Sequence, residues 1–175
     1  GNWGLAIGTF LVYGIIISIF QVIPKVGPVL VLFIAGPMLV GISMFSLSLS
    51  RGENARLEQI FEGFKNYGTV LGAYLLMVVL ILLWMLLLII PGIIAAIAYS
   101  QTFYILAEDD AISSMDALKK SKEMMDGYKW KYFCLGLRFI GWALLCILTL
   151  GIGFLWLSPY IQISYAKFYE DIKAA

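Results

Sequence analysis

Long uncharged stretches alternate with short charged segments along the chain. Residues 1–24, 26–50, 66–107 and 139–166 carry no charged side chain, and Lys25 alone separates the first two stretches. Charges of both signs fill residues 51–65 and 108–131. A helix needs about 20 apolar residues to cross the hydrocarbon core of a bilayer. Each uncharged stretch is therefore expected to hold one or two transmembrane helices.

Turn-forming residues divide these stretches. Residues 66–107 are long enough for two spans, and Pro91-Gly92 in their middle is a strong break signal. Residues 24–28, which include two prolines, and 150–153, which include two glycines, occupy comparable places. The pattern predicts an all-α polytopic membrane protein, a single domain with three hairpins made of six spans: residues 3–23, 29–50, 69–90, 93–107, 132–150 and 154–169.

The alternative is five spans, with one long helix kinked at Pro91. Basic residues concentrate in cytoplasmic segments of membrane proteins. Six spans place ten of the twelve basic residues on one side, with Lys25 on the other and Arg138 within a span. Five spans would put the two charged segments on opposite sides. The charge distribution therefore favours six spans in a bacterial cytoplasmic membrane, with both termini cytoplasmic.

Composition supports a membrane protein and narrows its chemistry. The chain is 62% hydrophobic and 13% charged, with a mean hydropathy of +0.93, whereas soluble domains carry about 25% charged residues. Its net charge of +1 predicts no nucleic-acid partner, and histidine is absent. We interpret Cys134 and Cys146 as apolar packing residues. We expect no cofactor.

Residues 1–23 lack the basic start of a signal peptide, and the initial Gly suggests that a native segment precedes them.

Two charged segments, residues 53–65 and 114–126, are predicted to form amphipathic helices at the cytoplasmic interface. The first carries Leu57, Ile60, Phe61 and Phe64 at helical spacing. In the second, Ser113 or Ser114 suits the N-cap and Gly127 the C-terminal stop. Aromatic residues and cations then alternate, as is typical of membrane interfaces. This region either binds lipid head groups or only anchors the helices, through Lys119, Lys120, Lys122, Lys129, Trp130 and Lys131.

Arg138 is the one charged residue that lies more than a helical turn from the end of a predicted span. Such a residue is costly in lipid and suggests a functional site. Gln101, Gln162 and Ser43 lie at a similar expected depth, and Glu108 could approach from the interface. These five residues are predicted to form a cytoplasm-accessible pocket in which Arg138 binds a lipid phosphate or carboxylate. In the alternatives, Arg138 extends back to the interface or pairs with Glu108 as a structural bridge.

No arrangement of residues suggests catalysis. The acidic residues 108–110 could bind a cation, but such a run more often caps a helix, and we predict no metal site. The leading hypothesis is a non-enzymatic protein that binds or organises anionic lipids, or supports another membrane system. The alternative is a small transporter or exporter component, or self-protection against membrane-active peptides. A homo-oligomer or an unknown membrane-protein partner fits either hypothesis.

Several ordered motifs resemble a known family. They include Leu-Leu-Ile-Ile-Pro-Gly-Ile-Ile at residues 87–94, Tyr-Ile-Leu-Ala-Glu-Asp at 104–109 and Leu-Thr-Leu-Gly-Ile-Gly at 148–153. Residues 117–129, 139–142, 159–160 and 168–169 continue the resemblance. The chain resembles the bacterial integral-membrane family catalogued as domain of unknown function 975. It is more distantly similar to the membrane domain of some glycerophosphodiester phosphodiesterases. The first resemblance implies a multi-span membrane protein without an assigned activity.

Overall fold

The computed structural model describes residues 3–22, 27–149 and 151–174, and every regular element in these ranges is a helix. Eight are α-helices, and the element η1 is a 3₁₀ helix. In chain order they are α1 (Trp3–Gln21), α2 (Gly27–Ser50), η1 (Leu57–Phe64), α3 (Tyr67–Leu87), α4 (Ile89–Ala98), α5 (Thr102–Glu108), α6 (Ser114–Met124), α7 (Lys129–Leu148) and α8 (Phe154–Lys173).

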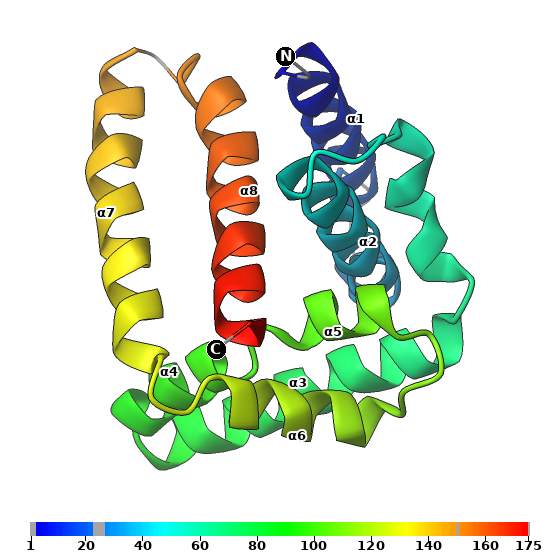
Figure 1. Ribbon diagram of the computed structural model, residues 1–175, viewed down its shortest axis with the longest axis vertical. Helices are drawn as coiled ribbons and strands as arrows, with labels where there is room; N and C mark the ends of the chain where they lie inside the picture. Colours follow the sequence, from blue (N-terminus) through cyan, green and yellow to red (C-terminus); the bar gives the residue numbers. More distant parts are fainter. Residues whose placement is uncertain (1–2, 23–26, 150, 175) are drawn as a thin grey trace.

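Helix α8 lies between α7 on one side and the α1–α2 pair on the other (Figure 1). Helices α3 and α6 pack side by side and run across the end of the α7–α8 pair at which the C-terminus lies (Figure 1). Element η1 packs along α2. The helices therefore pack in consecutive pairs, α1 with α2, α3 with α4 and α7 with α8, although the pairs are not parallel.

Five segments of the described chain are long and apolar enough to cross a membrane: Trp3–Gln21, Val29–Ser50, Tyr67–Leu87, Ile89–Glu108 and Lys129–Leu148. The predicted sixth span, residues 154–169, corresponds to α8, which continues to Lys173 and carries four charged residues in its last two turns. Its uncharged part is therefore shorter than a bilayer core requires. Lys25, expected on the outer side, falls outside the described residues.

The large apolar side chains most exposed to the surroundings lie where paired helices meet. Val22 is 78% exposed after α1, Leu86 is 88% exposed before the α3–α4 turn, and Leu148 is 80% exposed at the end of α7. Water would strongly disfavour such apolar surface at three separate places. Contact with lipid removes that cost.

The C-terminal half of α2 forms the centre of the packed core. Met38, Val40 and Phe45 are at most 1% exposed, and α2 contacts α1, α3, α5, α8 and η1. Gly41 allows the closest approach, since a Cβ there would lie 2.1 Å from the carbonyl oxygen of Ile60 in η1. Small residues permit helices to approach closely in lipid, and Gly41 in this way lets η1 pack beside α2.

The predicted turn at Pro91-Gly92 is wrong by a few residues. The chain breaks at Leu88, whose backbone is extended (φ −162°, ψ 141°), and Pro91 lies in the first turn of α4, where its missing N–H costs no helical hydrogen bond. Helix α4 folds back on α3, and a Cβ on Gly92 would lie 2.3 Å from Cγ of Met85. This contact excludes a single long helix through Pro91.

Residues 93–107, predicted as one helix, form two short helices with a break at Tyr99–Gln101. The hydroxyl of Ser121 in α6 donates to the carbonyl of Ala98 (2.8 Å) and accepts from the N–H of Gln101 (3.2 Å). A continuous helix would use both backbone groups within itself. Ser121 therefore satisfies the groups that the break leaves free.

The segment at residues 53–65, predicted as an amphipathic helix, is helical only in part. Its helical part is the 3₁₀ helix η1, in which side chains three residues apart align. Ile60 and Gly63 are buried against α2, whereas Phe61 and Phe64 are 48% and 37% exposed. The expected apolar stripe therefore divides between two faces.

The helix predicted at residues 114–126 is present as α6, which ends at Met124, two residues before the predicted end. The side chain of Ser113 accepts a hydrogen bond from the N–H of Asp116 (3.2 Å), and Gly127 adopts a left-handed φ of +80°. Buried Ala117, Leu118 and Ser121 face the rest of the protein, and α6 contacts α3, α4 and α5. Its charged residues therefore lie on the outward face.

Candidate functional site

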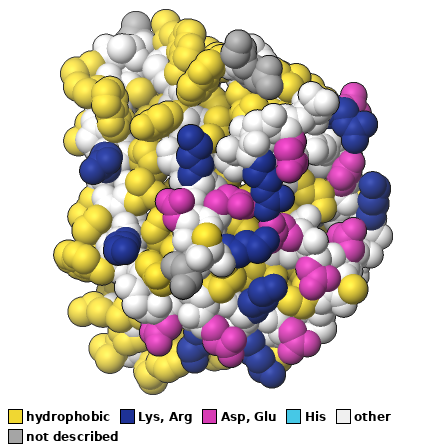
Figure 2. Space-filling view, in the orientation of Figure 1, with side chains coloured by type: hydrophobic (Ala, Val, Ile, Leu, Met, Phe, Trp, Pro, Cys, Tyr) yellow, Lys and Arg dark blue, Asp and Glu magenta, His cyan; other side chains and the backbone are white. Residues whose placement is uncertain are grey.

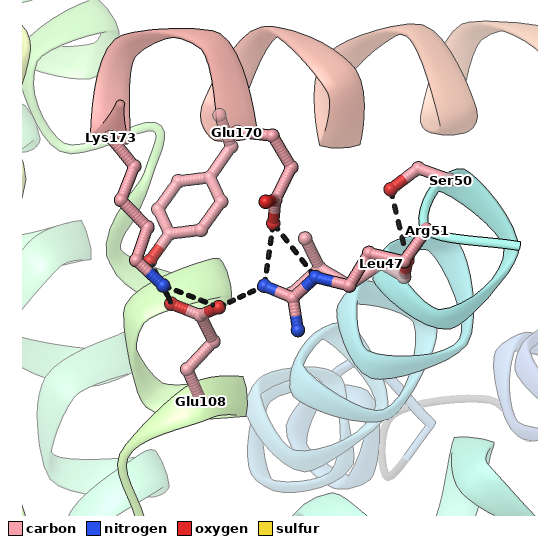
Figure 3. Close-up of polar contacts among 7 residues, drawn as sticks. Leu47, Ser50, Arg51, Glu108, Glu170 and Lys173 are labelled. Atoms are coloured by element: carbon pink, nitrogen blue, oxygen red, sulfur yellow. Dashed lines mark hydrogen bonds and ion pairs between the residues drawn. The ribbon is translucent and has the colours of Figure 1, made fainter. Parts of the chain in front are cut away.

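Charged side chains join the C-terminal ends of α2, α5 and α8. We call Arg51, Glu108, Tyr169, Glu170 and Lys173 the charged cluster. Glu108 ends α5 and accepts from Lys173 (2.7 and 2.8 Å), from the hydroxyl of Tyr169 (2.6 Å) and from Arg51. Arg51 follows α2 and also donates through Nε to Glu170 (3.0 Å). Figure 3 shows Arg51, Glu108, Glu170 and Lys173 converging from three helix ends.

The ion pairs and hydrogen bonds of the charged cluster connect the ends of α2, α5 and α8. The hydrogen bonds of Arg51 to Glu170 and then to Glu108 raise the pKa of the guanidinium above its ordinary value, so Arg51 stays charged. The Glu108 side chain is only 18% exposed, whereas its partners Arg51 and Lys173 are 32% and 49% exposed, so water screens the two ion pairs in part. Both carboxylates are already occupied by cations of the same cluster, and the arrangement ties three helix ends together.

A polar cavity of about 490 Å³ lies beside the charged cluster. Carboxylates, cations and amide or hydroxyl groups share its wall, which is lined by Ser48, Arg51, Gln59, Glu62, Glu108, Asp110 and Lys173 together with Met44, Leu47 and Ala107. Gln59 donates to the hydroxyl of Ser48 across it (3.0 Å). The mixed signs of charge give this cavity no clear preference for an anion or a cation.

The structure does not bring the predicted Arg138 pocket together. Arg138 lies exposed on α7 and forms no ion pair with the described residues. Glu108 pairs with Arg51 and Lys173 instead, so the suggested Arg138–Glu108 bridge is wrong.

The three neutral members of the predicted pocket have local partners. Ser43 is buried and donates to the Leu39 carbonyl in its own helix (2.8 Å). Gln101 is fully buried and donates to the Ser100 hydroxyl (2.9 Å). Gln162 accepts from the Tyr104 hydroxyl (3.4 Å). These contacts serve packing between or within helices and do not converge on one ligand position.

The predicted head-group residues, by contrast, belong to α6 and to the first turn of the next helix, α7. Lys119, Lys120 and Lys122 are exposed on the outward face of α6, and α7 begins soon afterwards with Lys129. We call the six residues Lys119, Lys120, Lys122, Lys129, Trp130 and Lys131 the cationic face. Figure 2 shows charged side chains gathered over α6, η1 and the end of α8, whereas hydrophobic ones dominate the side formed by α7.

An exposed indole accompanies these cations. Trp130 is 71% exposed and stacks on Phe133 with ring centroids 5.5 Å apart. Lys131 lies over the Tyr128 ring at 5.0 Å, and Lys129 pairs with Asp126 at 3.3 Å. The three lysines of α6 form no ion pair among the described residues. Their charges are therefore available to an external anion.

Reasoning from the sequence missed four members of the charged cluster. Arg51, Tyr169, Glu170 and Lys173 lie more than 50 residues from Glu108. The available signal was positional, because Arg51 and Glu108 each follow an uncharged stretch and should therefore lie at the same membrane face. The pairing itself depends on the packing of α8 against α2, which no local pattern specifies.

The fold and its surface define an all-helical protein with several helices suited to a membrane and with its charges collected near their ends. Residues 85–175 match the model of a family described as a protein of unknown function (DUF975), and the chain belongs to this family. No curated protein matches. No solved structure matches either.

Proposed function

We propose that this protein is a non-enzymatic integral membrane protein that binds anionic lipid head groups through its cationic face. The observation that carries the proposal is the set of three exposed, unpaired lysines on α6 beside the exposed indole of Trp130. Each Lys or Arg close to an anionic leaflet contributes about 1 kcal/mol of attraction. Tryptophan favours the head-group level of a bilayer.

We further propose that six spans cross the bacterial cytoplasmic membrane and leave both termini on the cytoplasmic side. The three exposed apolar turns, marked by Val22, Leu86 and Leu148, support a location in lipid, because water would disfavour such apolar surface. The charged cluster supports the six-span topology, because it joins the C-terminal ends of α2, α5 and α8. In this arrangement α8 is a short span whose last turns reach the interface.

Native mass spectrometry tests the lipid proposal. The full chain is released from nanodiscs that contain equal amounts of phosphatidylcholine and phosphatidylglycerol, and the retained lipids are counted by class. We expect phosphatidylglycerol to be enriched several-fold. The triple variant Lys119→Gln/Lys120→Gln/Lys122→Gln should remove most of this enrichment, because it removes the unpaired charges and retains the helix.

The matched control is Lys65→Gln, which removes an exposed cation from the end of η1, away from α6. It should leave the enrichment unchanged. Equal retention of the two lipid classes by the unmodified protein, or an undiminished enrichment in the triple variant, would overturn the proposal.

A further inference from the structure

A groove runs along α8 on the side that faces α1. Two cavities form it, one of about 390 Å³ and one of about 440 Å³, and Trp3 lines both. The first cavity also contacts the end of α2 and the second the α7–α8 pair. Trp3 is a wall of both cavities, and the two differ in chemistry.

One end of the groove carries an unpaired cation. Its lining includes Ser50, Arg51, Gly52 and Lys167. Arg51 is occupied by Glu108 and Glu170, but Lys167 is exposed and forms no ion pair with the described residues. Lysine presents three donors to a phosphate oxygen, so this end suits a monovalent phosphate ester.

The other end is almost entirely apolar and rich in aromatic rings. Trp142, Cys146, Gly153, Trp156, Leu157 and Tyr160 line it together with Trp3. Trp3, Trp142 and Trp156 are each half exposed, so their rings form walls that remain accessible from outside. A flexible hydrocarbon chain can fill such a surface, and its burial there is favourable in proportion to the area covered.

The spacing of the two ends matches a lipid. Trp156 precedes Lys167 by eleven residues on α8, which is about 16 Å along a helix. The hydrocarbon layer of one leaflet is about 15 Å deep, half the thickness of a bilayer core. We propose that this groove binds one anionic phospholipid, with its phosphate at Lys167 and an acyl chain along α8 between Trp3, Trp142 and Trp156. This inference rests on the proposed membrane location and concerns a site separate from the cationic face.

Tryptophan quenching tests the groove directly. The chain has five tryptophans, and the background Trp84→Phe/Trp130→Phe leaves the three in the groove. This variant is reconstituted in phosphatidylcholine vesicles with a small fraction of phosphatidylglycerol brominated on its acyl chains. We expect half-maximal quenching at a mole fraction about tenfold lower than for brominated phosphatidylcholine. Lys167→Gln should abolish the difference, and Lys167→Arg should retain it.

Lys65→Gln is the matched control, since it removes an exposed cation after η1, outside both the groove and the cationic face, and should leave the quenching preference intact. Equal quenching by the two lipids, or a preference that persists in Lys167→Gln, would contradict the proposal that the groove binds an anionic phospholipid. Circular dichroism of each variant verifies that the helices are formed. Quenching that depends on Lys167, together with mass spectrometry that shows no effect of the α6 lysines, would support lipid binding in the groove and contradict lipid binding by the cationic face. The reverse result rejects the groove alone.

Discussion

Helices α2 and α7 have similar length and are both apolar, yet they occupy opposite environments. Half of the membrane-length segment of α2 is buried within the protein, against about a tenth of that of α7. Phe139 is the one described residue of α7 that is buried. Helix α2 is surrounded by five elements, whereas α7 packs chiefly against α8 and α4. Apolar character therefore marks a helix as compatible with a membrane without showing whether lipid or protein covers it.

Side-chain size distinguishes the two helices better than hydropathy does. The packed half of α2 contains Gly36, Gly41, Ser43 and Ser46, which let neighbours approach its backbone. Large exposed side chains such as Trp142 cover most of α7. Close packing of small residues is a main source of helix association in lipid. The difference predicts which substitutions the protein tolerates.

The largest difference is expected for aromatic truncation. Phe45 on α2 is fully buried and contacts Phe10 of α1 edge to face at 6.3 Å, so Phe45→Ala should cost about 3–5 kcal/mol in the free energy of unfolding. Phe133→Ala on α7 should cost less than about 1 kcal/mol, because lipid can fill the vacated space. Unfolding by SDS in mixed micelles measures both values, and similar costs would contradict the comparison.

Glycine substitution should give the next largest effect. Gly41→Ala on α2 introduces a Cβ into the backbone of Ile60 and should cost about 2–3 kcal/mol through overpacking. Gly141 on α7 has no atom of the described residues within 4 Å of the corresponding position. Gly141→Ala should therefore be neutral or stabilising by about 0.5 kcal/mol. The same SDS titration tests the pair, and a destabilised Gly141→Ala protein would show that α7 is covered.

The sequence predicts where helices lie much better than it predicts how they pack. Uncharged stretches located every long helix. Of the two N-cap candidates of α6, Ser113 is the cap, and α6 ends at Met124, two residues before the predicted end. The 3₁₀ form of η1 was not predictable from residues 53–65, because it depends on the space above Gly41 in another helix. Likewise, the break before α5 depends on Ser121, which follows it by some twenty residues.

Removing the central charge of the charged cluster should have an intermediate effect. Glu108→Gln leaves Lys173 without a carboxylate and weakens the link between α2 and α8. Hydrogen bonds to charged groups contribute about 1.5–3 kcal/mol, and partial exposure of the partners places the expected loss of unfolding free energy near the lower limit. Glu62→Gln, whose pair with Lys65 is long (3.9 Å) and exposed, should change it by less than about 0.5 kcal/mol. Equal losses would mean that the cluster does not connect the helices.

The candidate site was less predictable than the positions of the helices, because its contacts also depend on how the helices pack. Ala117, Leu118 and Ser121 form the buried side of α6, so local helical spacing already leaves its three lysines exposed. The partners of Glu108 and Arg138 depend on which helices meet, and depth along separate spans does not specify rotation about each helix axis. Gln101 and Gln162 therefore have Ser100 and Tyr104 as hydrogen-bond partners, and neither forms a hydrogen bond with Arg138 in the described residues.

An effect similar in size to that of Glu108→Gln is expected in the second half-buried segment, Ile89–Glu108. Ser121→Ala removes the hydroxyl that serves Ala98 and Gln101 at the α4–α5 break, and it should cost about 1–2 kcal/mol because two buried backbone groups lose their partner. Ser18→Ala on α1 removes an exposed hydroxyl that donates to Gly14 within its own helix (2.7 Å) and should be neutral within about 0.5 kcal/mol. Hydrogen exchange of the Gln101 amide supplies a second readout. Faster exchange in Ser121→Ala, with unchanged exchange in Ser18→Ala, is expected if α6 stabilises the break. Unchanged exchange at Gln101 would show that the break persists without α6.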